Sequence, residues 1–210
     1  MKLLSKIKMS LNADKNWQQL PLPDAEVYYV PAFFSQQESC HYFAQLQEQV
    51  AWQQEHISMF GKKLPMPRLT AWYGDKGYTY SGLYNQPQPW LPVLQELKHK
   101  LEEQTGKPYN SVLLNFYRNG SDSMGWHADN EPELGQHPAI ASLSFGGTRR
   151  FGFRHRYKKE LQNHYLTLQH GSLLLMQGST QHFWQHSIPK TATAVEPRIN
   201  LTFRYVHERA

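Results

Sequence analysis

The segment GWHADN carries two side chains that commonly bind metals, His127 and Asp129, two positions apart. In an extended chain, side chains at this spacing point to the same side, so both can reach one ion. A third ligand is expected far downstream, where His170, His182 and His186 are the candidates. Two imidazoles and one carboxylate on one face of a metal, with the other positions open, form the facial triad of non-haem iron(II) oxygenases. On its own, an H-x-D pair is more typical of an exposed turn.

A second motif, PRINLTFRYV, lies near the C-terminus and alternates between polar and apolar residues. In a strand, such alternation places one polar row on a single face. The row consists of Arg198, Asn200, Thr202 and Arg204. Guanidinium groups pair with carboxylates in bidentate fashion, so this face suits a dicarboxylate, although a strand with one wet face shows the same pattern. The same spacing in LLNFY adds the amide of Asn115 and the phenol of Tyr117.

The elements that must position these residues are mostly strands. From Ser111 onward, short β-prone segments are separated by Gly, Asn, Asp and Pro: SVLLNFY, AIASLSF, RRFGFRH, HYLTLQ, SLLLM and RINLTFRYV. A closed or double-sheet assembly such as a jelly roll leaves few exposed edges for so many strands. Upstream we expect a strand at 27–31, a helix after the capping box of Ser35 and Glu38, and a second helix over 93–101. The predicted fold class is α+β.

Length and composition predict a single domain over residues 21–210, preceded by a flexible arm over 1–20. The single cysteine, Cys40, excludes an internal disulfide and fits a reducing compartment. Lysines interrupt the N-terminal apolar residues, and no segment approaches about 18 consecutive apolar residues, so we expect no membrane span and a cytoplasmic protein, or a nuclear one in a eukaryote. The net charge of +5 suits a polyanionic partner such as nucleic acid.

From about Phe60 to Tyr205 the chain resembles the AlkB family of alkylated-nucleic-acid repair dioxygenases. The resemblance is carried, in this order, by LLNFYRNGSDSMGWHADNE, PAIASLSFGGTRRFGFRH, HGSLLLM, HSIP and PRINLTFR. Within the family, the chain is most similar to the DNA-acting nuclear branch and its bacterial relatives, because PR is followed by WYGDKGYTYSG and because of the H-x-D-N-E run. The resemblance implies a double-stranded β-helix of the jelly-roll class, with N-terminal helices and a nucleotide-recognition hairpin lid at about 55–85.

The resemblance also implies the cofactors and the reaction. Iron(II) would be bound by His127, Asp129 and His186. The co-substrate 2-oxoglutarate would be held by the polar residues Asn115, Tyr117, Arg198, Asn200, Thr202 and Arg204. Within this set, Arg198 would meet the distal carboxylate and Arg204 the end nearer the metal. With O2, the enzyme would demethylate 1-methyladenine and 3-methylcytosine in DNA and release succinate, carbon dioxide and formaldehyde. The base must then be single-stranded or flipped from its stack.

Residues for gripping the base follow from the same resemblance. Tyr78 and Ser81 match the family's base pocket, and Glu131 matches a carboxylate that faces the base edge. Phe60, with Met59 beside it, matches a wedge on a hairpin that fills the gap left by a flipped base. Packing within the protein is the alternative for Tyr78, Ser81 and the wedge.

Two basic stretches could contact phosphates, and each also fits a solvated surface. The first contains Arg68 together with Lys62 and Lys63. The second contains four arginines alternating with phenylalanines: Arg149, Arg150, Arg154 and Arg156. Family members that prefer duplex DNA carry a basic cluster after the distal histidine, whereas this chain has Lys190 alone in KTATAVE. The strandedness of the substrate therefore stays open, and a monomer is expected.

Two other functions compete with DNA demethylation. The first is a related dioxygenase acting on RNA, protein or lipid; the Phe60 hairpin with its lysines favours nucleic acid among these. The second is a non-catalytic nucleic-acid-binding module on the same fold, which the complete triad and arginine motifs disfavour.

Overall fold

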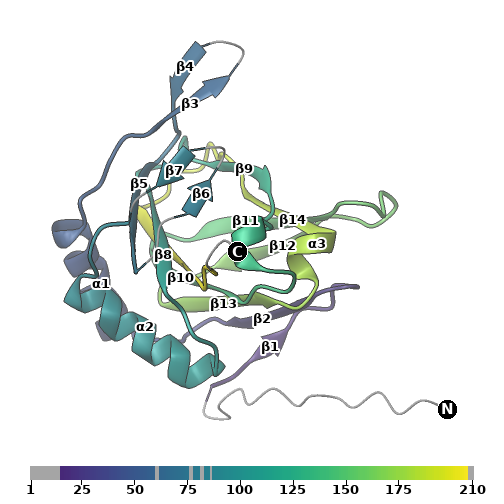
Figure 1. Cartoon of the computed structure of the whole chain (residues 1–210), viewed down its shortest axis with the longest axis horizontal. Helices are drawn as coiled ribbons and strands as arrows, with labels where there is room; N and C mark the ends of the chain where they lie inside the picture. The colour runs from purple at the N-terminus through teal and green to yellow at the C-terminus, as the bar shows by residue number, and fades with distance from the viewer. Residues whose placement is uncertain (1–14, 60–61, 76–77, 81–82, 86, 208–210) are drawn as a thin grey trace.

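Two antiparallel β-sheets make up most of the computed structural model (Figure 1). It describes residues 15–59, 62–75, 78–80, 83–85 and 87–207, without the side chains of 58, 59, 62, 78–80 and 83–85. The larger sheet has the order β1 (Gln18–Gln19), β2 (Glu26–Val30), β13 (Ser172–Gln177), β10 (Ile140–Gly146), β15 (Arg198–Arg204), β8 (Ser111–Tyr117) and β5 (Leu69–Gly74). The smaller sheet has the order β12 (His164–Leu168), β11 (Arg149–His155), β14 (Trp184–Ile188) and β9 (Met124–His127).

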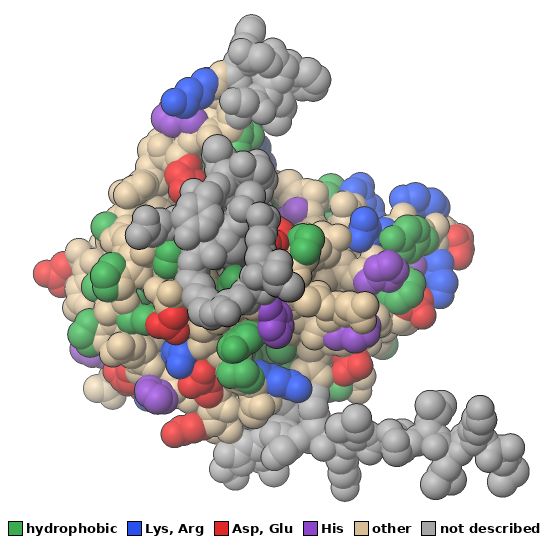
Figure 2. Space-filling view, in the orientation of Figure 1, with side chains coloured by type: hydrophobic (Ala, Val, Ile, Leu, Met, Phe, Trp, Pro, Cys, Tyr) green, Lys and Arg blue, Asp and Glu red, His purple; other side chains and the backbone are tan. Residues whose placement is uncertain are grey.

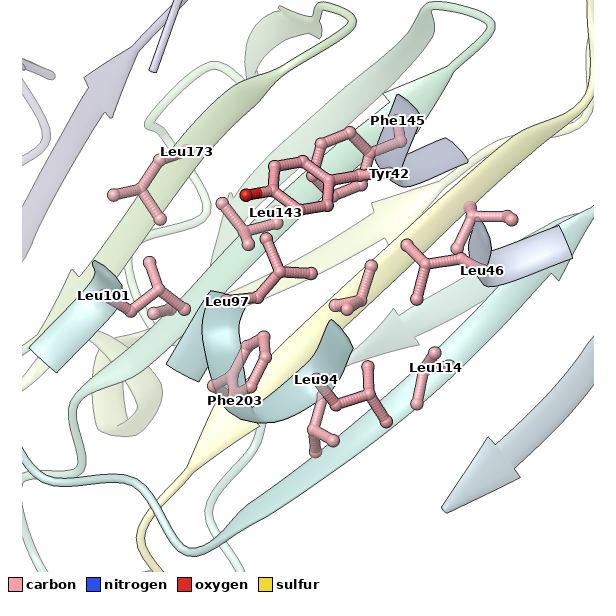
Figure 3. Close-up of a cluster of buried hydrophobic side chains, with 14 of the residues drawn as sticks. Tyr42, Leu46, Leu94, Leu97, Leu101, Leu114, Leu143, Phe145, Leu173 and Phe203 are labelled. Atoms are coloured by element: carbon pink, nitrogen blue, oxygen red, sulfur yellow. The ribbon is translucent and has the colours of Figure 1, made fainter. Parts of the chain in front are cut away.

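Two helices cover the outer face of the larger sheet (Figure 1). Helix α1 (Gln36–Gln49) begins at the predicted capping box, in which Ser35 and Glu38 satisfy each other's backbone N–H groups. Helix α2 (Pro92–Thr105) ends at Gly106, whose φ of 63° is the left-handed conformation that glycine adopts without a steric penalty. Figure 3 shows the leucines of α2 packed against Phe203 of β15. This apolar layer fixes which face of β15 is turned away from the helices.

The opposite face of β15 is turned toward the smaller sheet. All seven residues of this strand are buried, including its four polar ones. A second apolar cluster fills the space between the sheets, with Leu113 and Tyr117 from β8, Phe151 and Phe153 from β11, and Trp184 from β14 among its members. The arrangement is that of a jelly roll, as the spacing of short strands predicted.

Shorter elements complete the structure. They are the hairpin of β3 (His56–Met59) and β4 (Lys62–Pro65), the hairpin of β6 (Tyr78–Tyr80) and β7 (Leu83–Asn85), the single 3-10 turn η1 (Pro132–Leu134) and the one-turn helix α3 (Thr180–Phe183). No helix in the described part of the chain is both long enough and apolar enough to cross a membrane.

The predicted flexible arm over residues 1–20 needs correction at its C-terminal end. Within it, β1 pairs with β2, and Leu20 is buried in the core between the sheets. Lys15 also donates a hydrogen bond to the carbonyl of Phe33. Residues 15–20 are therefore part of the folded body, while residues 1–14 lie outside the described chain.

Candidate functional site

The three residues of the predicted metal site meet between the two sheets. His127 on β9 and His186 on β14 are directly opposite each other in the antiparallel pair, with ring centroids 4.2 Å apart. Asp129 follows β9 by two residues. One potential ligand atom from each of the three side chains lies within 4.8 Å of the others. The alternative His170 is not among them, because its Nδ1 accepts the backbone N–H of Gly146 at the far end of β10.

The two imidazoles are prepared to bind a cation. Nδ1 of His127 donates to the carbonyl of Gly125 at 3.0 Å, which leaves the Nε2 lone pair free for a metal. His186 is buried and its ring stacks on Phe151. Burial lowers the pKa of His186 to about 3, and the nearby charge of His127 acts in the same direction. His186 is therefore neutral at physiological pH, as a metal ligand must be.

The carboxylate of Asp129 is held from two directions. Its Oδ1 lies 2.9 Å from Nη2 of Arg204, and its backbone N–H donates to Oε1 of Gln181 on α3. Burial alone would raise the pKa of Asp129, but Arg204 and the two histidines outweigh it and lower the pKa to about 2. Oδ2 is buried and has no hydrogen-bond partner among the described residues. A buried, ionised oxygen beside two imidazole nitrogens fits a divalent cation.

The predicted polar row of β15 lies beside this centre. Asn200 pairs with Asn115 of β8, and Arg198 pairs with Tyr117, so the residues named from the two motifs share one face. All six are buried. The cavity that contains the metal-site side chains is also lined by Asn115, Tyr117, Asn200, Thr202 and Arg204.

The environment of Arg198 indicates whether this face fits a dicarboxylate. Its side chain is 0% exposed, and its Nη2 donates to Oγ of Ser144. Its Nε and Nη1 have no acceptor among the described residues. Burial lowers the pKa of this guanidinium to about 10, so it is still charged at neutral pH. A buried cation with two unused donors is costly unless an anion joins it, and a carboxylate supplies the matching pair of oxygens.

Arg68 has a different position from the one predicted. The expectation that it contacts phosphate is wrong for this structure, because the residue is only 5% exposed. Its Nε donates to Oδ1 of Asn115 at 2.7 Å, and its Nη1 donates to the carbonyl of Ser123. Because Oδ1 of Asn115 accepts this bond, the amide NH2 of Asn115 is left to act as a donor. Arg68 thus orients a residue of the polar row.

The predicted base-contacting residues are only partly described. Glu131 follows Asp129 by two residues. Burial, and then the charge of Asp129, raise the pKa of Glu131. Its Oε2 is buried and has no hydrogen-bond partner within the described chain. Phe60 and Ser81 lie outside the described residues, and the side chains of Met59 and Tyr78 are not described.

Several residues of the site were not anticipated from the sequence. On β10, Oγ of Ser142 accepts a hydrogen bond from the amide of Asn200, and Oγ of Ser144 accepts one from the guanidinium of Arg198. The alternation in AIASLSF was the signal that could have identified them. Gln181 had no comparable signal, because its role depends on how α3 packs beside Asp129.

Comparisons with known proteins agree with this geometry. A family model described as the 2OG-Fe(II) oxygenase superfamily matches residues 26–204. The human alpha-ketoglutarate-dependent dioxygenase alkB homolog 3 is 45% identical over 195 residues, covering 89% of this chain and 68% of that protein. The human DNA oxidative demethylase ALKBH2 is 36% identical over 206 residues, covering 93% and 78% respectively.

A solved structure of OsALKBH1 has the same fold, with a TM-score of 0.61 at 18% identity, covering 90% of this chain and 100% of that one. The matched family supplies the cofactors that the donor set fits, Fe(II), 2-oxoglutarate and O2. With the superfamily match spanning most of the fold and relatives at this identity, the chain belongs to the AlkB family of Fe(II)- and 2-oxoglutarate-dependent dioxygenases.

Proposed function

We propose that this enzyme repairs DNA by removing the methyl groups of 1-methyladenine and 3-methylcytosine. Similarity to the human DNA oxidative demethylase ALKBH2 supports the substrate class. The observation that carries the proposal is the carboxylate of the half-buried Glu131, two residues beyond Asp129, whose buried Oε2 has no hydrogen-bond partner among the described residues. Methylation at these ring nitrogens makes each base a cation, and a carboxylate in a low-dielectric site attracts a cation strongly.

We assign the metal to His127, Asp129 and His186, and 2-oxoglutarate to the polar row. Iron(II), when bound there with 2-oxoglutarate and O2, would supply the oxidation of the N-methyl carbon, with 2-oxoglutarate converted to succinate and carbon dioxide and the oxidised methyl carbon released from the base nitrogen as formaldehyde. Arg198 would hold the distal carboxylate, and the donor NH2 of Asn115 would face the co-substrate.

The site residues already have the protonation states that metal binding requires. Asp129 is ionised and His186 neutral at physiological pH, because their pKa values lie at about 2 and about 3. Phe151, Met176 and Ile188 line the same cavity with apolar side chains and exclude water from it. A base reaches such an enclosed site only as a single-stranded or flipped nucleotide.

For the base itself, we propose contacts from Tyr78 and Ser81, with Phe60 and Met59 as the wedge and the lid spanning about 55–85. The β3–β4 hairpin projects from the body beside β9 and β5, which supports this placement (Figure 1). A single domain over 21–210, the monomeric state and the cellular compartment stay predictions from the sequence.

The test supplies iron(II), 2-oxoglutarate and air to the purified protein with a DNA oligonucleotide carrying 1-methyladenine. We expect the oligonucleotide to lose one methyl group by mass and succinate to form in equal amount. His127→Ala and Asp129→Ala should each lower both rates by at least about 1,000-fold while the circular dichroism spectrum is retained. His99→Ala, on the exposed surface of α2, is the matched control. Succinate formation without methyl loss from DNA would contradict the proposal, and the same lesion in RNA identifies the alternative substrate.

A further inference from the structure

The outer face of the smaller sheet carries a cluster of arginines and aromatic rings that the proposed reaction does not use. Along β11, Phe151 and Phe153 point into the core between the sheets. Arg150, Gly152 and Arg154 alternate with them and therefore lie on the opposite face. The alternation of Arg and Phe in RRFGFRH separates an interior row from this outer row.

Each of the two outer arginines lies on an aromatic ring. The guanidinium carbon of Arg150 is 3.5 Å from the ring centroid of Tyr165 on β12, a ring that is 41% exposed. The guanidinium carbon of Arg154 is 4.6 Å from the Trp126 ring on β9, and its Nη2 donates to Oε1 of Gln185. Arg154 is therefore held in place, whereas Arg150 makes no hydrogen bond or ion pair among the described residues.

Gly152 lets the two rings approach each other over the sheet. A Cβ atom at this position would lie 2.9 Å from Cη2 of Trp126 and 3.1 Å from Cε1 of Tyr165. Real side chains do not approach so closely without a shift, so the absence of a side chain is what allows both rings to cover β11. The result is a continuous aromatic surface from β12 to β9.

A groove of about 320 Å³ runs along this surface. Trp126, Arg150, Tyr165 and Lys190 line it, and the described lining residues include no acid. Met124, Ser187 and Ile188 belong to the walls of both this groove and the central cavity. Trp126 also precedes the candidate ligand His127 on β9, the edge strand of the smaller sheet. The groove therefore borders the catalytic cavity around that edge.

Further basic side chains lie at the other end of β11. Figure 2 shows Lys and Arg side chains, with acidic ones among them, where the connection between β11 and β12 projects, on the right in that view. A guanidinium lying flat on an aromatic ring keeps its N–H edges available, and phosphate oxygens match them in bidentate fashion. Contacts of this kind position a strand without reading its sequence.

We propose that this groove binds the substrate strand itself, with Arg150 and Lys190 holding phosphates beyond the two that adjoin the target nucleotide. The inference rests on the proposed nucleic-acid substrate. It places Lys190 beside a second basic residue, Arg150 of β11. It also favours a single-stranded substrate that passes around β9 at the edge of the smaller sheet. The ring of Tyr165 fixes the direction of Arg150, and Arg154 supports the ring of Trp126, which lines the groove.

The test compares substrates of two lengths. Single-stranded DNA of about 15 nucleotides with a central 1-methyladenine extends into the groove, whereas a trinucleotide with the same central lesion does not reach beyond its nearest phosphates. For the double variant Arg150→Gln/Lys190→Gln, we expect KM on the long substrate to rise about tenfold at about 50 mM salt, with kcat and trinucleotide turnover unchanged. The slope of log affinity against log salt should become shallower by about 1.4, the value for two single-strand phosphate contacts.

Two further variants separate stacking from charge. Arg150→Lys keeps the charge but loses the planar fork, and Tyr165→Leu removes the ring beneath it. Each should therefore raise KM on the long substrate, but by less than the double variant does. Lys107→Gln, beyond α2 on the helical side of the molecule, removes one positive charge, as each substitution of the double variant does, and should leave KM on the long substrate unchanged. Equal KM values for wild type and the double variant on the long strand would overturn the inference, as would an equal loss on the trinucleotide.

The inference and the proposed function fail in different ways. Fluorescence anisotropy with an unmodified DNA strand of the same length measures the affinity of the groove for the strand without any turnover. If the wild-type protein demethylates no oligonucleotide but binds this strand through Arg150 and Lys190, the proposed reaction is wrong and the groove is retained. If it demethylates both lengths and the double variant binds the strand normally, only the groove is wrong.

Discussion

Strands β15 and β11 both alternate polar with apolar residues, yet Arg198 of β15 and Arg150 of β11 have opposite environments. Arg198 of β15 is fully buried, because helices cover one face of the larger sheet and the smaller sheet covers the other. Arg150 of β11 is exposed, because nothing in the described chain covers the outer face of the smaller sheet. A buried guanidinium with unused donors selects one small anion, whereas an exposed guanidinium on a ring suits a long polyanion. Burial, rather than residue type, separates the two roles.

The largest effect should come from the buried arginine. Arg198→Met keeps much of the side-chain volume but removes the cation, and we expect KM for 2-oxoglutarate to rise about 100-fold, with a smaller change in kcat. Steady-state succinate formation at varied 2-oxoglutarate measures it. Arg150→Met is the matched change on the exposed strand and should leave this KM unaltered. A similar KM increase in both variants would remove the distinction between the two faces.

A half-exposed arginine provides an intermediate case. Arg118 donates to both carboxylate oxygens of the buried Asp122 in the turn before β9. We expect Asp122→Asn to lower the free energy of unfolding by about 1–2 kcal/mol at pH 7, the lower part of the range for hydrogen bonds to charged groups, because the side chain of Arg118 is 44% exposed. Chemical denaturation measures the change.

The same pair predicts a pH dependence. Burial would raise the pKa of Asp122, but hydrogen bonds from Arg118 outweigh it and lower the pKa below 3.8. A depressed carboxyl pKa stabilises the fold above the unfolded value and loses that contribution as the pH falls through the folded value. The difference between wild type and Asp122→Asn should therefore be full above about pH 4 and shrink below it. A difference that grows toward low pH would contradict the ion pair.

Arg68 tests whether a buried arginine also acts indirectly. Arg68→Met frees the amide of Asn115 to rotate, so we expect KM for 2-oxoglutarate to rise about tenfold, less than for Arg198→Met. Arg68→Lys should recover part of the loss, because an ammonium can donate to the same oxygen. If instead KM for the oligonucleotide rises and that for 2-oxoglutarate does not, Arg68 does not act on the co-substrate through Asn115.

The smallest effect belongs to the exposed face. Gly152→Ala should push the Trp126 and Tyr165 rings apart and reduce affinity for a single strand about threefold, with little change in stability because both ring edges border solvent. Tryptophan fluorescence would report the shift of Trp126. An unchanged spectrum with unchanged affinity would show that the rings yield without consequence.

The sequence predicted the parts of the fold that depend on local pattern. The capping box before α1, the second helix (α2) and the alternation in β8 and β15 were all found in the structure. Strands β5 and β14 were not anticipated, because LTAWYG and WQHSI show no clear alternation; most of their residues are buried regardless of side. The position of Arg68 was also wrong, since no local pattern reveals that Asn115 and Ser123 accept its hydrogen bonds.

The support of Asp129 has a consequence for dynamics. Its two imidazole partners stand on paired strands, whereas its own main-chain N–H is bonded to Gln181 on the short helix α3. Binding of a metal to all three side chains would link Asp129, and through Gln181 the helix α3, to the paired strands β9 and β14. Amide hydrogen exchange at Asp129 should therefore slow on iron loading, and α3 should become part of the same cooperative opening unit as β9 and β14.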